Sequence, residues 1–320
     1  MTSKQSKPRR SQFRRKRGTE RALKTWTPRA EALLMAVYEN DVINADQLHF
    51  LVGGSRQTLT RLCLNMAEDG YIDPPDVQKQ DSRTGGRKTF AYRLGDVGAR
   101  RLKDQGCDVI AADTSYWRKK NLELRDTHFH HKLLNTAINI GLARAAHELG
   151  GSYTWERESE RTTDEVSITL RGKTIPYRVE PDSLGRLIWK TPQNEHKRWL
   201  FIEADRATMP LTRRSSYIGT SLHKKYLAYL EWRFRKKGHL KLGISGFTVL
   251  TVTTSEERAR HLRDMIPTEV DPKGQGTHLF WSCAFPGDAN FGDFLKPIWF
   301  SGGDPIDSDK RRSLLDVDQE

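Results

Sequence analysis

The chain has 320 residues, a formal net charge of +13 and a sequence pI near 9.7. This length leaves room for two domains, and the positive excess favours a polyanionic partner, most often nucleic acid. No apolar run approaches the roughly eighteen residues that span a bilayer, so we expect neither membrane insertion nor a secretory signal. The cysteines, Cys63, Cys107 and Cys283, are too far apart for a zinc spacing and fit a reducing, cytoplasmic location.

Residues 1–25 are predicted to form a basic, disordered tail. Ten basic residues and one acid lie between Lys4 and Lys24. Such a segment can follow DNA phosphates with an affinity that depends on salt and not on base sequence. A solubilising tail or a targeting signal is the alternative interpretation. The densest basic run is Arg14, Arg15, Lys16 and Arg17.

Residues 26–105 are predicted to form a winged helix-turn-helix domain. Thr27-Pro28, Asn44 and Ser55 are typical starts of three successive short helices. Strand-like segments at 71–72 and 90–94 then flank a polar loop. In a winged helix-turn-helix the third helix enters the major groove of DNA. A winged helix that contacts protein is the alternative.

The expected DNA contacts lie on the third helix and on the polar loop. Side chains in the first turns of the helix can reach base edges or phosphates, and cations on the loop suit phosphates or the minor groove. These residues are Arg56, Gln57, Thr58, Thr60 and Arg61 on the helix, and Arg83, Arg87 and Lys88 on the loop.

A linker over 106–126 is expected to join this domain to an α/β domain over 127–300, followed by a flexible tail over 301–320. The order of helices and strands predicts a mixed sheet with flanking helices. The expected helices cover 130–149, 215–235 and 255–265, and the expected strands cover 152–159, 165–171, 174–181, a segment ending at Asp205, 246–253 and 279–283.

Acidic residues mark the centre of the second domain. Asp182 follows Pro181, and Glu203 and Asp205 alternate at the end of an apolar strand. A period of two puts Glu203 and Asp205 on the same face of that strand. Carboxylate oxygens are the ligands that Mg²⁺ and Mn²⁺ prefer, so the pattern predicts a metal site. A strand that runs out into solvent is the alternative.

Pro181-Asp182 followed by Glu203-x-Asp205, within this order of elements, resembles the restriction-endonuclease-like nuclease core. The usual signature of that core is Pro-Asp and then Asp/Glu-x-Lys, and Asp205 stands here at the lysine position. The resemblance implies that Asp182, Glu203 and Asp205 are catalytic and hold Mg²⁺ or Mn²⁺. Lys225, or its neighbour Lys224, on the next helix is then expected to supply the missing ammonium group.

Further short motifs in a fixed order extend the likeness over residues 27 to 266. They are Tyr92-Arg93-Leu94 with Gly98 and Leu102, His131 with Leu134 and Asn135, Pro181-Asp182, Phe201-x-Glu203-x-Asp205, and Lys225 with Tyr229. Together they resemble the replication-relaxation family of bacterial plasmids and mobile elements, which is similar in layout to MobC-type plasmid mobilisation relaxases.

This resemblance implies a cytoplasmic bacterial protein that nicks DNA during replication or mobilisation. The expected partners are double-stranded DNA, single-stranded DNA at an origin, and either a second copy of the chain or other transfer and replication proteins. A non-catalytic DNA-binding regulator, built on an inactive nuclease-like core, is the alternative, because nuclease-like folds also serve as binding modules.

Histidines near the start of the second domain offer a different site. His128-Phe129-His130 spells the metal-binding motif of another relaxase class, in which the histidines lie on a strand and a helical tyrosine attacks DNA. Helical periodicity begins directly after His130, which argues against that site. His131 and Asn135 lie one helical turn apart, and they either face the acidic site or cap the core.

Overall fold

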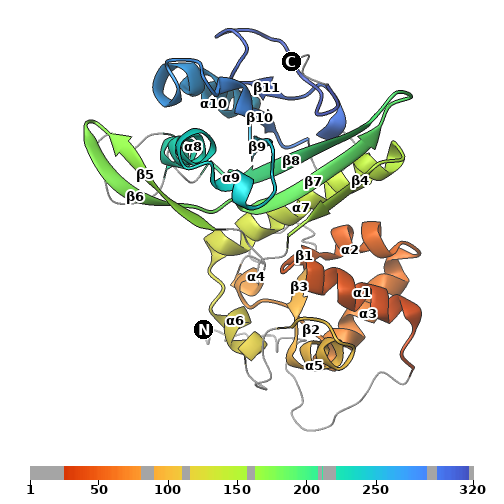
Figure 1. Cartoon of the computed structure of the whole chain (residues 1–320). Coiled ribbons are helices and arrows are strands. Elements are labelled where there is room, and N and C mark those ends of the chain that lie inside the picture. Colours follow the sequence, from red (N-terminus) through yellow and green to blue (C-terminus); the bar gives the residue numbers. More distant parts are fainter. Residues whose placement is uncertain are drawn as a thin grey trace, which may run out of the picture. The chain divides into compact units, whose positions relative to one another are not determined.

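The computed structural model describes residues 25–80, 90–109, 116–156, 163–207, 211, 221–286 and 294–316. The chain divides into two compact units, residues 1–129 and 130–320, and the boundary falls inside the helix that begins at Asp126 (Figure 1). Among the described helices, none is both long and apolar enough to cross a membrane. The expected DNA contacts Arg14, Arg15, Lys16, Arg17, Arg83, Arg87 and Lys88 lie outside the described residues.

The first unit combines short helices with a three-stranded antiparallel sheet. Its elements are α1 (Pro28–Glu39), β1 (Ile43–Asn44), α2 (Ala45–Val52), α3 (Arg56–Glu68), β2 (Ile72–Asp73), α4 (Val77–Gln80), β3 (Ala91–Leu94), α5 (Asp96–Asp104) and α6 (Tyr116–Leu122). The strand order is β1-β3-β2. Buried leucines from α1, α2, α3 and β3 form its core.

The helix starts in this unit follow from their capping residues. Thr27 Oγ1 accepts a hydrogen bond from the Ala30 N–H at 3.2 Å, Asn44 and Gln47 form a capping box, and Ser55 caps α3. These contacts satisfy backbone donors that a helix start leaves open. The sequence does not predict β1, because two residues are too few to show an alternation.

The second unit contains a six-stranded sheet, a separate hairpin and several helices. Its elements are α7 (Asp126–Glu148), β4 (Ser152–Trp155), β5 (Asp164–Leu170), β6 (Lys173–Val179), β7 (Ser183–Lys190), β8 (Glu195–Ala204), α8 (Leu222–Leu230), η3 (Glu231–Arg235), α9 (Gly238–Lys241), β9 (Phe247–Thr253), α10 (Glu256–Met265), η4 (Ile266–Val270), η5 (Thr277–Leu279), β10 (Phe280–Ala284) and β11 (Phe300–Ser301). The strand order is β11-β10-β9-β8-β7-β4, and β5 pairs only with β6 in the described sheets.

This sheet mixes two pairing modes. β4, β7 and β8 are antiparallel neighbours, whereas β9 is parallel to β8 and β10 is parallel to β9. Parallel neighbours need a crossover connection, and α8 and α10 lie in those two connections. The mixed sheet with its helices confirms the predicted α/β class.

Alternation along β8 divides its side chains between two cores. Leu200 and Ile202 pack in the cluster that includes Ile138 of α7. Phe201 packs in the other cluster, with Tyr229 of α8. The two helices therefore cover opposite faces of the sheet, as Figure 1 shows. By the same period of two, Glu203, which follows Ile202, faces α8.

Two segments differ from the sequence prediction at the start of helices. α7 begins at Asp126 and not at residue 130, so His128 and His130 both lie on a helix and not on a strand. The helix expected over 215–235 is described from Leu222 as α8, and residues 212–220 lie outside the described part.

The C-terminal segment also differs from the prediction of a flexible tail over 301–320. The described residues up to 316 pack onto the second unit: Leu314 is fully buried, and Arg312 Nη2 lies 2.5 Å from Asp304 Oδ1. Trp299 and Arg312 pair as an isolated antiparallel bridge. The sequence does not predict this packing, because ion pairs and one buried leucine hold the segment in place. The segment has no periodic pattern of apolar residues that would indicate a helix or a strand.

Candidate active site

Asp182 lies where β7 begins and β8 ends. Its backbone N–H donates to the Ile202 carbonyl oxygen at 3.0 Å, and its Oδ2 accepts from the Ala204 N–H at 2.8 Å. Ile202 and Ala204 flank Glu203 on β8, so these two hydrogen bonds fix the Asp182 carboxylate beside Glu203.

Lys225 brings Asp182 and Glu203 into one charged cluster. Its Nζ lies 2.5 Å from Glu203 Oε2 and 3.5 Å from Asp182 Oδ1. Lys225 is in the first turn of α8, where Ser221 caps the helix and sets its phase. The sequence leaves Lys224 and Lys225 as alternatives, and the structure places Lys225 between the two carboxylates.

His131 and Tyr229 contact the outer and inner sides of this cluster. His131 Nε2 lies 3.2 Å from Asp182 Oδ1, and the Tyr229 hydroxyl donates to Glu203 Oε1 at 2.5 Å. Glu203 and Tyr229 are buried, whereas the His131 side chain is 36% exposed. The cluster of Asp182, Glu203, Lys225, His131 and Tyr229, called the acid–lysine cluster below, therefore meets solvent on the His131 side.

Burial and charge together set the protonation of this cluster. Burial disfavours ionised Asp182, but Lys225, His131 and the Ala204 N–H outweigh it and hold the pKa of Asp182 well below its usual range. Burial raises the pKa of Glu203 to about 7, against the opposing effects of Lys225 and Tyr229. Burial also opposes charge on Lys225, yet the two carboxylates raise its pKa above the usual value. Asp182 and Lys225 are therefore both charged at neutral pH.

A polar network beneath Asp182 fixes the start of β7. Asn135 Nδ2 donates to the Asp182 carbonyl oxygen at 3.2 Å, and Asn139 Nδ2 donates to Ser183 Oγ at 3.0 Å. The Tyr153 hydroxyl donates to Asn139 Oδ1 at 2.8 Å. Hydrogen-bonded networks of this kind hold buried groups in one orientation. Asn139 is not among the residues predicted from the sequence, where its only signal is an amide one turn after Asn135 inside an apolar stripe.

Asp205 binds a different partner. Its carboxylate forms an ion pair with the Arg258 guanidinium, and Arg258 Nη2 donates to Oδ1 at 3.1 Å. The Thr253 hydroxyl donates to Oδ2 at 2.7 Å. The structure thus brings together two of the three expected metal ligands, Asp182 and Glu203, and not the third. Within the described residues, no group of three or more His, Cys, Asp or Glu side chains is placed to hold a metal ion.

The expected DNA contacts of the first unit lie on the exposed side of α3. Leu59, Cys63 and Met66 bury the other side of this helix. Arg56 forms an ion pair with Asp46. The exposed side chains in the first two turns are Arg56, Gln57, Thr58, Thr60 and Arg61.

These observations define a two-unit protein whose α/β unit contains the largely buried acid–lysine cluster. A model of the Replication-relaxation family matches residues 34–239, a range that includes Asp182, Glu203 and Lys225. The chain belongs to the replication-relaxation family, which confirms the resemblance noted in the sequence. Comparison with curated proteins and with solved structures gives no match.

Proposed function

We propose that this protein binds DNA of a plasmid or mobile element and nicks it at the acid–lysine cluster. The observation that carries the proposal is the convergence of Asp182 and Glu203 on the Lys225 ammonium, at 3.5 and 2.5 Å. In the restriction-endonuclease-like cores that the sequence resembles, the lysine follows the second acid. Asp205 occupies that position here, and Lys225 provides the ammonium from α8 instead.

The donor set fits a single hard cation. Mg²⁺ in proteins is commonly held by one or two carboxylates, with waters and substrate phosphates as its remaining ligands. Asp182 and Glu203 both lie within 3.5 Å of one group, Lys225 Nζ, so they are close enough to share a cation. Bound by these two residues, Mg²⁺ or Mn²⁺ would supply positive charge next to the scissile phosphate.

Each member of the cluster has a separate role in this proposal. Water attacks phosphorus, the bond to the leaving sugar oxygen breaks, and that oxygen takes up the proton that the water loses. Lys225 stabilises the negative charge that develops on the phosphate oxygens. Tyr229 fixes Glu203, and the Ala204 N–H fixes Asp182. His131, whose side chain is the most exposed of the five, is proposed to contact the DNA backbone.

The first unit is proposed to find the DNA. Its order of helices and strands is compatible with a winged helix-turn-helix, with α3 in the major groove of a duplex origin. Gln57 and Arg61 on α3 are exposed and of the types that bond to adenine and guanine edges. In this role the protein works in the bacterial cytoplasm, as a homodimer or with other replication or transfer proteins.

A Glu203→Gln variant tests the proposal, because it removes a carboxylate charge and keeps the side-chain shape. Nicking of a supercoiled plasmid that contains the element's own origin should fall on the order of 10³-fold, the effect of losing several kcal/mol of charge stabilisation. A gel shift on the same origin should stay unchanged, since the first unit is untouched. Nicking at the wild-type rate by this variant would exclude the cluster as the active site.

One observation favours the second candidate function, a non-catalytic regulator of plasmid replication or transfer. Asp205 is bound by Arg258, which leaves two carboxylates at the cluster, and the Lys225 ammonium already lies between them. In this case the origin is bound equally well with and without divalent cations. Neither Mg²⁺ nor Mn²⁺ then produces a nick, in the wild type or in the variant.

A further inference from the structure

One face of the sheet in the second unit has an exposed surface at its antiparallel edge. Across β4, β7 and β8, Thr154 is the register partner of Arg186, and Arg186 is the partner of Trp199. The adjacent row is Ser152, Ile188 and Lys197. Register partners point to the same face of a sheet, so these six residues share one surface, called the Trp199 face below.

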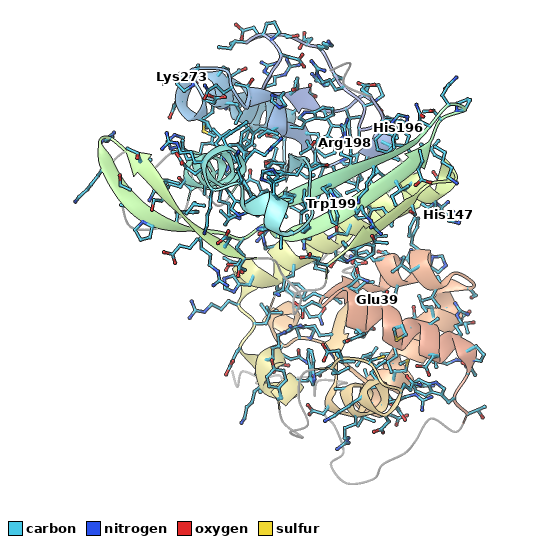
Figure 2. All side chains as sticks on the ribbon, viewed as in Figure 1. Glu39, His147, His196, Arg198, Trp199 and Lys273 are labelled. Atoms are coloured by element: carbon cyan, nitrogen blue, oxygen red, sulfur yellow. The ribbon has the colours of Figure 1, made fainter. Side chains whose placement is uncertain are left out.

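The Trp199 face differs from the opposite face of the same strands. There, Tyr153, Leu187 and Leu200 are buried in the cluster that includes α7 residues. On the Trp199 face, Ser152, Thr154 and Lys197 are exposed, and Trp199 lies half-buried at the margin of the α8 core. Figure 2 shows Trp199, Arg198 and His196 in succession along β8.

The charges on this surface are unbalanced. Arg186 Cζ lies 5.7 Å and Lys197 Nζ 5.1 Å from the centroid of the Trp199 ring. Within the described part of the chain, neither cation lies at ion-pair distance from an acid. Lys190, farther along the same face, is balanced by Glu195 at 3.7 Å. Two cations beside a half-buried indole are therefore left for an external anion.

This combination fits a single-stranded nucleic acid. Bases of a single strand stack on aromatic rings displayed by a sheet, while nearby cations bind the phosphates. A duplex hides the base faces that an indole needs. We propose that the Trp199 face binds single-stranded DNA, with a base stacked on Trp199 and phosphates bound by Arg186 and Lys197.

Strand β8 contributes both Trp199 and Glu203 of the acid–lysine cluster. Glu203 follows Trp199 by four residues on β8 and faces the same side of the sheet, so the two lie about 14 Å apart. Phe201 lies between them on that face and is buried in the α8 core, and the cluster meets solvent on the His131 side, so the Trp199 face is a surface separate from the opening of the cluster. The inference rests on the proposed function in taking DNA as the partner, but it does not require that the cluster cleaves.

Fluorescence anisotropy with a labelled twelve-residue oligothymidine tests the inference on the full chain. Trp199→Ala should weaken binding roughly 5- to 100-fold, the range for loss of one base stack. Trp199→Phe keeps a ring and should bind within a few fold of wild type. Lys197→Glu should weaken binding and reduce its salt dependence, whereas Lys273→Ala, an exposed cation elsewhere in the unit, should not.

The outcomes separate this inference from the proposed nicking. If Trp199→Ala and Lys197→Glu both bind oligothymidine with the affinity of the wild type, the inference is overturned, whatever the nicking assay shows. Weaker binding in both variants supports it, even if the wild type never nicks DNA. If the wild type binds oligouridine more tightly than oligothymidine, and the same variants lose oligouridine binding, the surface is assigned to RNA. That result would also overturn the proposal.

Discussion

Replacing Lys225 by methionine is expected to lower origin nicking by about 10²- to 10³-fold, the typical cost of losing one preorganised charge at a reacting centre. The same change should strengthen Mn²⁺ binding, because the ammonium lies 2.5 and 3.5 Å from the two carboxylates and repels a second cation there. Mn²⁺ should therefore raise the melting temperature of the variant more than that of the wild type. Single-turnover nicking and thermal melts measure the two effects.

Lys236→Met is the matched control for this experiment. Lys236 lies just after η3, and its Nζ pairs with Asp164 at 2.5 Å, outside the acid–lysine cluster. The control removes the same charge, yet both nicking and the response to Mn²⁺ should stay close to wild type. A Lys225→Met protein that nicks as fast as the control would show that the ammonium has no part in the reaction.

Arg258→Met is expected to destabilise the second unit by about 3 kcal/mol, because it leaves a buried carboxylate without its cation. The Asp205 side chain is only 2% exposed, and Arg258 is its ion-pair partner. For a unit of this size the melting temperature should fall by roughly 6–12 °C. Urea unfolding of the variant against wild type measures the difference.

The double variant Asp205→Asn/Arg258→Met distinguishes a structural Asp205 from a metal ligand. Removing both charges should restore most of the lost stability, since no buried charge is then left unpaired. Nicking should also be retained, because Asp205 does not share the centre formed by Asp182 and Glu203. A double variant that is stable but does not nick DNA would show that Asp205 is needed for catalysis.

The acids of the site could be located from sequence because they depend on local pattern. Pro181 marks the approach to a strand at Asp182, and a period of two turns Glu203 to one face of an apolar strand. The same period correctly groups Phe201 with Glu203, since both contact Tyr229 of α8. The α/β class likewise follows from the order of periodic segments.

The partner of Asp205 could not be derived, because it comes from a distant segment. Arg258 is 53 residues from Asp205, and no local pattern connects them. The choice between Lys224 and Lys225 depends on the phase of α8, which Ser221 sets. The sequence predicts a longer helix and therefore leaves that phase open. The contact between Trp199 and Arg186 likewise cannot be predicted without the strand register, which pairs these two residues across β7 and β8.

The most direct test of the central claim is nicking of supercoiled origin plasmid by wild type and by Asp182→Ala, each with and without Mn²⁺. The proposed site predicts open circles that form only with wild type and Mn²⁺, while both proteins shift the same origin fragment in a gel. Equal nicking by Asp182→Ala would contradict the site. No nicking by the wild type, with the gel shift intact, would contradict catalysis and leave a DNA-binding regulator.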